Sequence, residues 1–272
     1  RDYGADALSG FDLVIVDEVH RVCARVMSQS LRVPARWYLG LSATMNRSDG
    51  RHLFLEWVFG PDRDRVLVTT DTQTVKVERV EVQSSRYVTR LIKSIRPGTS
   101  PIQIHARMTS TLCKCFERNQ FLVRCTRALL GEGRMLLLVS DRIGQLETLF
   151  ECLRDDDFED IQVLTGKTKE SQRTIRPETR IVLATINLVK EGWDGVPHFD
   201  TLLCCSRMSN EVVLRQLHGR IMRPHPDKKD PLVIDVCDSC DPTSSRARGR
   251  MYQRVSKDPR ACVQYVVSVK TY

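Results

Sequence analysis

The stretch Phe11-Asp-Leu-Val-Ile-Val-Asp-Glu-Val-His20 joins an apolar run to two adjacent carboxylates and a histidine. A continuous Val/Ile/Leu run predicts a strand buried on both faces of a parallel sheet, and in such sheets ligands bind beyond the carboxyl ends of the strands. There Asp17 is a candidate ligand for the Mg²⁺ of a nucleotide, and Glu18 is a candidate base for an attacking water. The stretch predicts a nucleoside triphosphatase, and a cluster that caps a surface helix is the alternative.

Composition narrows the class of protein. With 272 residues, the chain is long enough for one large or two ordinary domains. A hydrophobic content of 41% predicts a folded protein rather than a disordered tail. The net charge of +8 and the pI of about 9.1 favour a polyanionic partner, nucleic acid before membrane. A generic basic surface is the alternative.

The ten cysteines are expected to be reduced thiols. No signal peptide is visible and no apolar run approaches the roughly 18 residues of a membrane span. We therefore expect an intracellular protein, nuclear or cytoplasmic, including the cytoplasm of a virus-infected host. Cys237/Cys240 and Cys113/Cys115 have a spacing that suggests zinc, but a zinc site takes four ligands and neither pair has a matching second pair. We interpret these thiols as buried or incidental.

The order of apolar runs predicts an α/β fold. In the first segment, strands are expected at Leu13–Val16, Trp37–Leu41, Val66–Thr69 and Val75–Val82. In the second, they are expected at Met135–Val139, Ile161–Leu164, Ile181–Ala184, Thr201–Cys204 and Leu232–Val236, with Val263–Val269 as an edge strand. Strands that alternate with helical stretches predict a parallel, doubly wound sheet. Turn residues around Pro97 and Pro101 predict a linker between the segments.

Two motifs place hydroxyl groups at the ends of predicted strands. Ser42-Ala43-Thr44 follows the second strand, where its hydroxyls can hydrogen-bond the region of His20, and helix capping is the alternative. Thr185 ends another strand and can contact a nucleic-acid phosphate. The following Glu191-Gly-Trp-Asp-Gly195 brings Asp194 within reach of a nucleotide or an arginine, and a simple turn is the alternative.

A third motif carries positive charge. Gln216, Gly219, Arg220 and Arg223 share one face at helical spacing. Two guanidinium groups beside a glycine that allows close approach suit a polyphosphate, and arginine fingers contribute about 10³–10⁵ in the rate of phosphoryl transfer. A solvated basic face is the alternative.

Thr165-Gly-Lys-Thr168 has the ending of a phosphate-binding loop, but we reject that interpretation. The full loop is G-x-x-x-x-G-K-[ST], and Ile161 occupies the position of its first glycine. Because the turn follows a predicted strand, we expect it to make a backbone or nucleic-acid contact.

The four motifs occur in the order D-E-V-H, S-A-T, A-T…E-G-W-D and Q-x-x-G-R-x-x-R, which resembles the superfamily 2 helicases and translocases. Two segments are most similar in sequence to the XPB-like and poxvirus transcript-release branch. They are Leu39–Asp49 and Ile234–Asp238, the second followed by basic residues and Tyr252. The resemblance covers nearly the whole chain. It implies two RecA-like domains with parallel sheets, ATP and Mg²⁺ between them, and DNA or RNA across both.

The resemblance also implies domain boundaries and partners. Residues 1–85 would be the C-terminal part of the first RecA-like domain, residues 86–118 a linker, and residues 119–272 the second RecA-like domain. Transcription or replication machinery would be the setting, nucleic acid would be held mainly through its backbone, and no membrane is expected.

The family's residue roles transfer onto matching positions. Asp17 would hold Mg²⁺, Glu18 would activate water, and His20 would couple the nucleotide to Gln216. Ser42 and Thr44 would link hydrolysis to domain motion. Arg220 and Arg223 would contact the γ-phosphate, with Gly192 and Asp194 also facing the nucleotide. The positions expected along the nucleic acid are Ser140, Thr165, Gly166, Arg173 and Thr185.

One departure from the family is large. The sequence contains no G-x-x-x-x-G-K-[ST] loop, which the family places upstream of D-E-V-H in the first domain. The first domain is therefore expected to be incomplete, the chain to be a piece of a longer protein, and the piece alone to hydrolyse ATP poorly. A non-catalytic nucleic-acid-binding or regulatory module derived from a helicase is the alternative. A helicase–nuclease is less favoured, because no spare acidic cluster stands out.

Overall fold

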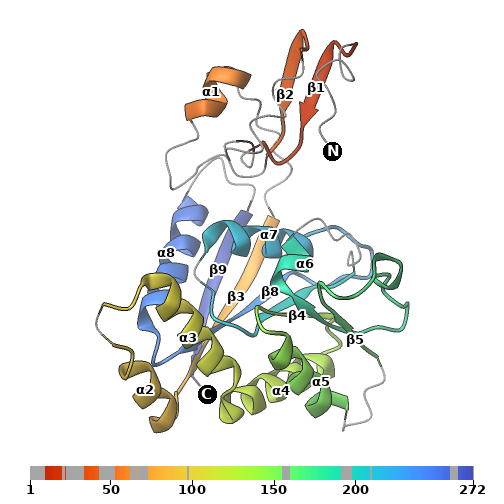
Figure 1. Ribbon diagram of the computed structural model, residues 1–272. Coiled ribbons are helices and arrows are strands. Elements are labelled where there is room, and N and C mark those ends of the chain that lie inside the picture. Colours follow the sequence, from red (N-terminus) through yellow and green to blue (C-terminus); the bar gives the residue numbers. More distant parts are fainter. Residues whose placement is uncertain are drawn as a thin grey trace. The chain divides into compact units, whose positions relative to one another are not determined.

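The computed structural model describes residues 10–19, 22, 34–42, 53–61, 66, 73–96, 98–154, 160–190, 198–208, 210–257 and 263–271. The chain divides into two compact units, unit 1 (Arg1–Val68) and unit 2 (Thr69–Tyr272). Figure 1 labels most of their helices and strands.

Unit 1 contains a pair of short parallel strands and one helix. The strands are β1 (Leu13–Val16) and β2 (Trp37–Gly40), and the helix is α1 (Leu53–Phe59). Val19, Val22 and Leu55 are buried together and form a small apolar core. The pair confirms two of the strands expected from the sequence. The expected strand 66–69 falls outside the described residues except for Val66, which lies in no strand.

The prediction that β1 is buried on both faces is wrong. Leu13 and Ile15 are 49% and 57% exposed. Their register partners on β2, Trp37 and Leu39, are 61% and 46% exposed. These four side chains form one apolar face, which we call the β1–β2 apolar face. The described part of unit 1 covers only the opposite face, where Val16 packs against the small core.

Unit 2 is built on a seven-stranded sheet with the order β5-β6-β4-β7-β8-β3-β9. Every pairing in it is parallel, which confirms the predicted α/β fold with a doubly wound sheet. The strands are β3 (Gln73–Val82), β4 (Leu136–Ser140), β5 (Ile161–Leu164), β6 (Ile181–Thr185), β7 (Thr201–Cys204), β8 (Leu232–Asp238) and β9 (Val263–Thr271).

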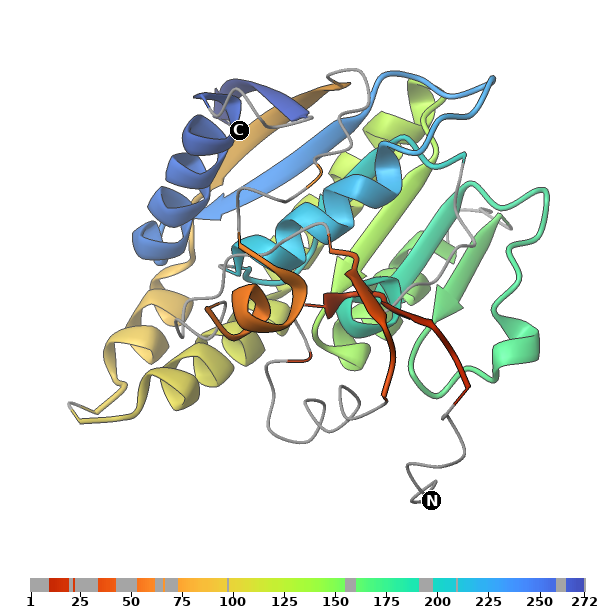
Figure 2. The ribbon, with the colours of Figure 1, turned by 90° about the horizontal axis from the view of Figure 1, so that it is seen from above.

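Helices cover both faces of this sheet. Successive residues of a strand point to opposite faces, so Leu137 and Val139 of β4 enter one core with Tyr252, and Leu136 and Leu138 enter the other. The first core takes residues from α6, α7 and α8, and the second from α4 and α5 (Figure 2). The helices are α2 (Arg86–Lys93), α3 (Pro101–Cys113), α4 (Phe116–Gly131), α5 (Ile143–Arg154), α6 (Ile186–Lys190), α7 (Glu211–Ile221) and α8 (Pro242–Lys257).

The boundary between the units differs from the expected one. Residues 1–85 are expected in the first domain, but β3 pairs with β8 and β9 in the sheet of unit 2. Val75 and Val77 are fully buried there, and removing such side chains from water favours this position of the strand. The expected linker 86–118 forms α2, α3 and the start of α4. Val88 and Leu112 pack together in it.

Candidate nucleotide and nucleic-acid sites

Two polar strand ends meet in unit 1. The carboxylate pair Asp17-Glu18 follows β1 directly, and Ser42 lies two residues beyond β2. The Leu41 amide donates a hydrogen bond to the Val16 carbonyl (2.8 Å), and the Val19 amide donates one to the Leu41 carbonyl (2.9 Å). These two bonds hold the carboxylates and Ser42 at the same edge of the parallel pair, which is where the strand order predicts a ligand site.

The turn that carries the carboxylates has an unusual backbone. Glu18 has a φ of +49°, in the left-handed region, where a residue with a side chain costs about 1–2 kcal/mol. Asp17 Oδ1 accepts a hydrogen bond from the Glu18 amide (2.8 Å), which orients the Asp17 carboxylate. Asp17 is exposed and Glu18 is half-buried. Backbone strain of this kind is concentrated at functional sites, so the turn is a candidate site on geometry as well as on sequence.

The residues at this edge fit a Mg²⁺ ion that arrives with a nucleotide. Mg²⁺ is usually held by one or two carboxylates, with phosphate oxygens and waters completing its shell. Asp17 offers an exposed, oriented carboxylate at a strand end. Among the residues that the structure describes, no group of three or more His, Cys, Asp or Glu side chains is placed to hold a metal ion.

Helix α7 carries the second candidate set, in unit 2. Asn210 caps the helix, because its side chain accepts hydrogen bonds from two first-turn amides (3.0 and 3.3 Å). Gln216 and Arg220 are half-buried and lie four residues apart. An Arg220 Nη donates to the Lys190 carbonyl at the end of α6 (3.4 Å). Nothing lies within 4 Å of where a Cβ would sit on Gly219, so the space beside these side chains is open.

Arg223 does not continue that helical face. Helix α7 ends at Ile221, so Arg223 lies two residues beyond it, and the prediction of one helical face for all four residues is wrong for Arg223. The Arg223 carbonyl accepts a hydrogen bond from Lys228 Nζ (2.8 Å). Burial, together with the charge of Arg223, lowers the pKa of Lys228 to about 8. A bound anion would favour the charged form of this lysine.

The turn after β5 brings together Thr165, Gly166 and Arg173, three residues for which the family resemblance predicts a nucleic-acid contact. The Thr165 amide donates to Thr168 Oγ1 (3.0 Å), and Thr165 Oγ1 accepts from the Lys167 amide (3.2 Å). Arg173 Nε donates to the Thr168 carbonyl (3.0 Å). Gly166 and Lys167 are exposed at the tip. The turn is a compact loop with a basic tip, and no helix of the phosphate-loop kind follows it.

Ser140 and Thr185 end neighbouring strands, with Ser140 opposite Thr185 in the register of β4 and β6. Ser140 is fully buried. Its hydroxyl donates to Gln145 Oε1 (2.7 Å) and accepts from the Arg142 amide (3.0 Å), so it supports the start of α5. Thr185 is half-buried. The structure therefore brings the two residues to one edge, but only Thr185 is open to a ligand in this conformation.

Several predicted site residues lie outside the described residues. They are His20, Thr44, Gly192 and Asp194.

Buried ion pairs in unit 2 are the feature that the sequence did not reveal. Asp235 on β8 accepts from Arg248 Nε of α8 (2.5 Å) and from Arg79 Nε of β3 (3.0 Å). Arg118 Nε of α4 donates to Asp238 Oδ1 (2.7 Å). Burial alone would lower the pKa of Arg248, but Asp235 raises it above its ordinary value. The buried positions of α8, at 244, 248, 251, 252 and 255, have helical spacing, and that spacing could have identified Arg248 as internal.

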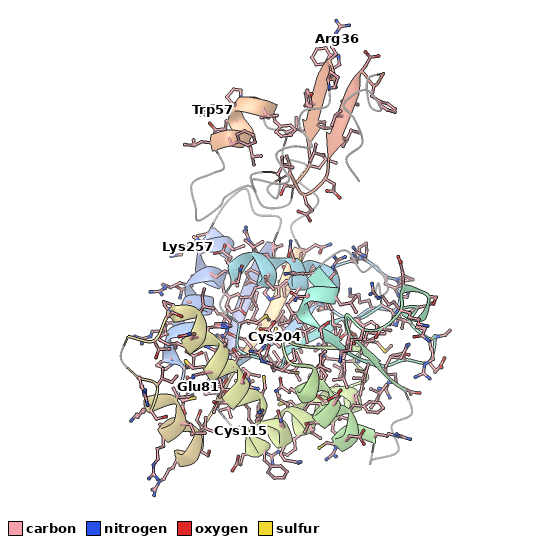
Figure 3. All side chains as sticks on the ribbon, viewed as in Figure 1. Arg36, Trp57, Glu81, Cys115, Cys204 and Lys257 are labelled. Atoms are coloured by element: carbon pink, nitrogen blue, oxygen red, sulfur yellow. The ribbon has the colours of Figure 1, made fainter. Side chains whose placement is uncertain are left out.

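The described cysteines are free thiols, and two of them, at and just after the end of β7, are buried. Cys204 and Cys205 are buried in unit 2, and Figure 3 labels Cys204. Burial raises the pKa of Cys205 to about 12, which leaves almost no thiolate at neutral pH. None of the described helices is long and apolar enough for a bilayer span.

No protein-family model matches the chain. Curated proteins do match it. A protein of Acanthamoeba polyphaga mimivirus, named as a candidate ATP-dependent RNA helicase, L396, is 26% identical over 259 residues, or 93% of this chain and 49% of that protein. The probable helicase D10 of Escherichia phage T5 is 24% identical over 273 residues, or 93% of this chain and 56% of that protein. The chain thus spans about half the length of the curated relatives it matches.

Among solved structures, the crystal structure of T4 UvsW matches with a TM-score of 0.52 and 15% identity, over 99% of this chain and 56% of that one. This similarity supports the α/β fold. Together, the sequence matches show distant homology to helicases over most of the chain, in agreement with the resemblance to superfamily 2.

Proposed function

We propose that the chain is part of an ATP-dependent helicase or translocase of superfamily 2, which couples ATP hydrolysis to movement on DNA or RNA. Unit 1 would be the C-terminal part of the first RecA-like domain and unit 2 the second. The observation that carries the proposal is the meeting of Asp17-Glu18 and Ser42 at the carboxyl ends of two hydrogen-bonded parallel strands. The distant helicase homology supports it.

In this proposal the two units supply complementary groups to ATP. Asp17 binds the Mg²⁺ that neutralises the phosphates, and Glu18 accepts a proton from the attacking water or orients it. Arg220 and Arg223 stabilise negative charge that develops on the γ-phosphate. Residues in supporting roles are Gln216, His20, Ser42, Thr44, Gly192 and Asp194.

Nucleic acid would bind unit 2 at the turn after β5. Gly166 and Lys167 are exposed, so the backbone of Gly166 and the ammonium group of Lys167 can reach a ligand. Arg173 is hydrogen-bonded to the same turn, and Thr185 lies at the end of the neighbouring strand β6. Such contacts reach phosphates rather than bases, so binding would depend steeply on salt and little on sequence. Transcription or replication machinery is the proposed setting.

The test is nucleic-acid-stimulated ATPase activity of the intact protein. We expect Glu18→Gln to lower kcat by about 10²–10⁴ and Arg220→Ala by about 10³–10⁵, with ATP binding retained. Arg215→Ala is the matched control, because Arg215 is another half-buried arginine of α7, and its guanidinium lies 4.0 Å from the Glu211 carboxylate rather than at the proposed site. The chain of residues 1–272 alone is expected to hydrolyse ATP poorly.

One outcome would remove a residue role from the proposal, and another would overturn the proposal itself. Wild-type ATPase in the Arg220→Ala protein would remove the arginine-finger role. Nucleic-acid binding without any ATPase in the intact protein would favour the alternative, a non-catalytic module derived from a helicase.

A further inference from the structure

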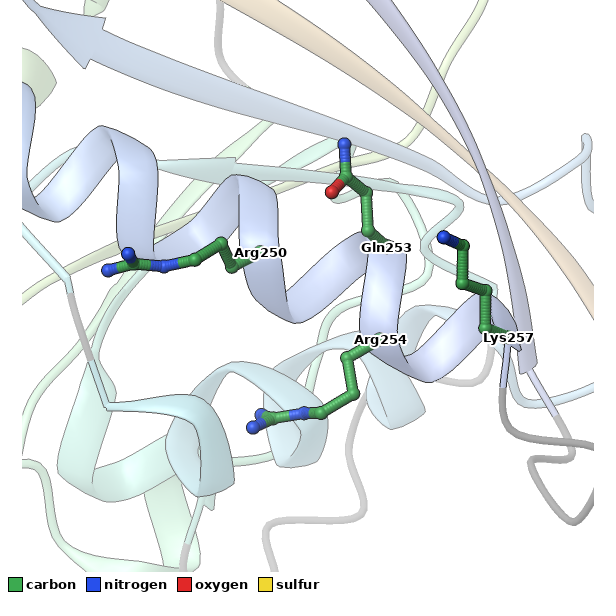
Figure 4. A pocket seen from close by; sticks show the side chains of 4 residues that line it. All are labelled: Arg250, Gln253, Arg254 and Lys257. Atoms are coloured by element: carbon green, nitrogen blue, oxygen red, sulfur yellow. The ribbon is translucent and has the colours of Figure 1, made fainter.

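The second half of α8 presents a basic face. Arg250, Gln253, Arg254 and Lys257 are spaced by three and four residues, so they lie on one side of the helix. Figure 4 shows all four side chains projecting from α8, where they line an open hollow of about 550 Å³. We call these four residues the α8 basic face.

The helix beneath this face is fixed in place. Met251, Tyr252 and Val255 are at most 3% exposed and pack into the core. One turn earlier, Arg248 is 6% exposed and paired with Asp235. The same helix therefore uses one arginine for internal pairing and places its other cations outward. Because the backbone is held, the outward cations are arranged at fixed spacing rather than on a mobile tail.

Only one carboxylate among the described residues touches the α8 basic face. Glu211, at the start of α7, forms an ion pair with Arg254 and also lies 4.0 Å from Arg215. The side chains of Arg250 and Lys257 make no hydrogen bond or ion pair with any other residue that the structure describes. Two cations and the amide of Gln253 are thus available to a ligand, and Arg254 can be shared with one.

The spacing of the cations fits a polymer of phosphates. Arg250 and Lys257 are seven residues apart, which is about 10 Å along a helix at a rise of about 1.5 Å per residue. A nucleic-acid strand in a duplex carries a phosphate about every 3.4 Å of axis, so this span faces about three phosphates. No exposed apolar side chain belongs to the face, which disfavours a lipid surface.

We propose that the α8 basic face binds the sugar–phosphate backbone of nucleic acid, at a second site separate from the turn after β5. This inference deepens the proposed function and rests on it, since it adds a contact for the same nucleic acid. Helix α8 packs against β8 and β9, whereas β5 is the opposite edge strand of the sheet. With strands about 4.8 Å apart, the two edges lie on the order of 25–30 Å from each other. Arginine forks favour phosphate oxygens, which they bind in bidentate fashion.

The test is fluorescence anisotropy of the 272-residue chain with a labelled 20-nucleotide oligo-dT and a labelled 20-base-pair duplex over a salt series. The variant is Arg250→Gln, Arg254→Gln and Lys257→Gln combined. We expect its affinity to fall about tenfold or more at low salt. The slope of log K against log salt should fall by about 2, since each lost contact to a single strand removes about 0.7.

A matched control removes the same charge elsewhere. Arg86, Arg90 and Lys93 are exposed on α2, also at helical spacing, and their combined change to Gln should lower the affinity less than threefold. Glu211→Gln is expected to have the opposite effect on affinity. Because it removes the carboxylate that pairs with Arg254, it should tighten binding about twofold to threefold.

The outcomes separate this inference from the proposed function. Equal losses in the α8 and α2 variants would show a general charge effect and overturn the second site, while leaving the helicase proposal intact. Labelled poly-glutamate is the third probe in the same anisotropy assay. If the α8 variant loses binding to poly-glutamate but not to nucleic acid, the face would be assigned to an acidic protein and the second site would be overturned. If the wild-type chain binds neither oligonucleotide, both the second site and the nucleic-acid part of the proposed function fail.

Discussion

Unit 1 and unit 2 both place polar residues at the ends of parallel strands, but they support those residues differently. In unit 1, the described core consists of Val19, Val22 and Leu55, and the β1–β2 apolar face is open to solvent. In unit 2, each face of the sheet has its own extensive core, and buried ion pairs centred on Asp235 and Asp238 join β8 to the elements beside it. The carboxylate pair Asp17-Glu18 is thus supported by the smaller of the hydrophobic cores.

The difference suggests that the residues with candidate catalytic roles and the residues that stabilise the fold lie in different units. Asp17 and Glu18 are exposed or half-buried, and their turn holds a left-handed residue. In unit 2, the buried carboxylates of Asp235 and Asp238 instead form ion pairs that join secondary-structure elements. An exposed apolar face such as that of β1–β2 is typical of a surface that contacts another protein segment. We therefore expect unit 2 to fold firmly and unit 1 to be the less stable part.

The largest expected effect is in unit 2. Asp235→Ala would leave Arg79 and Arg248 as buried charges without their carboxylate, which costs about 3–5 kcal/mol of unfolding free energy. Urea denaturation followed by circular dichroism measures it. Asp230→Ala is the control, because Asp230 forms an exposed ion pair with Lys76, worth about 0–1 kcal/mol. A loss under 1 kcal/mol in Asp235→Ala would mean that the buried network does not hold unit 2 together.

A pair of leucine truncations compares the two cores directly. Leu138 in β4 and Leu55 in α1 are both at most 2% exposed. We expect Leu138→Ala to cost about 4 kcal/mol and Leu55→Ala about 2 kcal/mol, because a small core collapses more readily around a cavity. Hydrogen exchange read by mass spectrometry reports each unit separately. If Leu55→Ala speeds exchange in the peptides of unit 2 as strongly as in unit 1, the two do not unfold independently.

The sequence was most informative where periodicity and strand-end chemistry agree. The strands from β4 to β8 were predicted almost to their ends, because fully buried strands read as apolar runs. Alternation marks β3 as a strand but does not show which sheet it joins, and only the structure shows that it pairs with β8 and β9. The ends of α7 were also misjudged at Arg223, because a motif does not show where a helix stops. The partners of Arg248 could not be predicted from the sequence, since they lie on β8 and at Met208 and only the fold brings them to α8.

Protonation of one buried histidine should give unit 2 a pH dependence. His218 Nδ1 lies 2.8 Å from the hydroxyl of Tyr265, and its ring packs near Tyr252. Burial, reinforced by the charge of Arg215, lowers the pKa of His218 to about 3. The unfolded chain takes up a proton near the ordinary pKa of about 6.5, whereas the folded chain does not. Stability from this group is therefore present above about pH 6.5 and falls as the pH drops toward 3, by about 1.4 kcal/mol per pH unit.

Comparison of two proteins isolates that effect. Between pH 6.5 and 5 we expect the wild type to lose about 2 kcal/mol more than His218→Gln, measured by urea denaturation at each pH. Groups that titrate in both proteins cancel in the difference. Parallel pH profiles would show that His218 is accessible to a proton in the folded state, and that the core around Tyr265 is looser than its burial indicates.

The smallest expected effect tests the close packing of unit 1. A Cβ on Gly40 would lie 3.0–3.1 Å from the methyl groups of Val19 and 3.2 Å from Phe59 Cδ1. Gly40→Ala therefore overpacks the small core, and we expect a loss of about 1 kcal/mol, seen as faster exchange at the amides of β1 and β2. In Gly144→Ala, the control in unit 2, nothing lies within 4 Å of the new methyl group. That change should be neutral or stabilise α5 by up to about 1 kcal/mol. Should Gly40→Ala leave exchange in unit 1 unchanged, Val19 must be free to move aside, and the turn that holds Asp17 and Glu18 is then not fixed by packing beneath it.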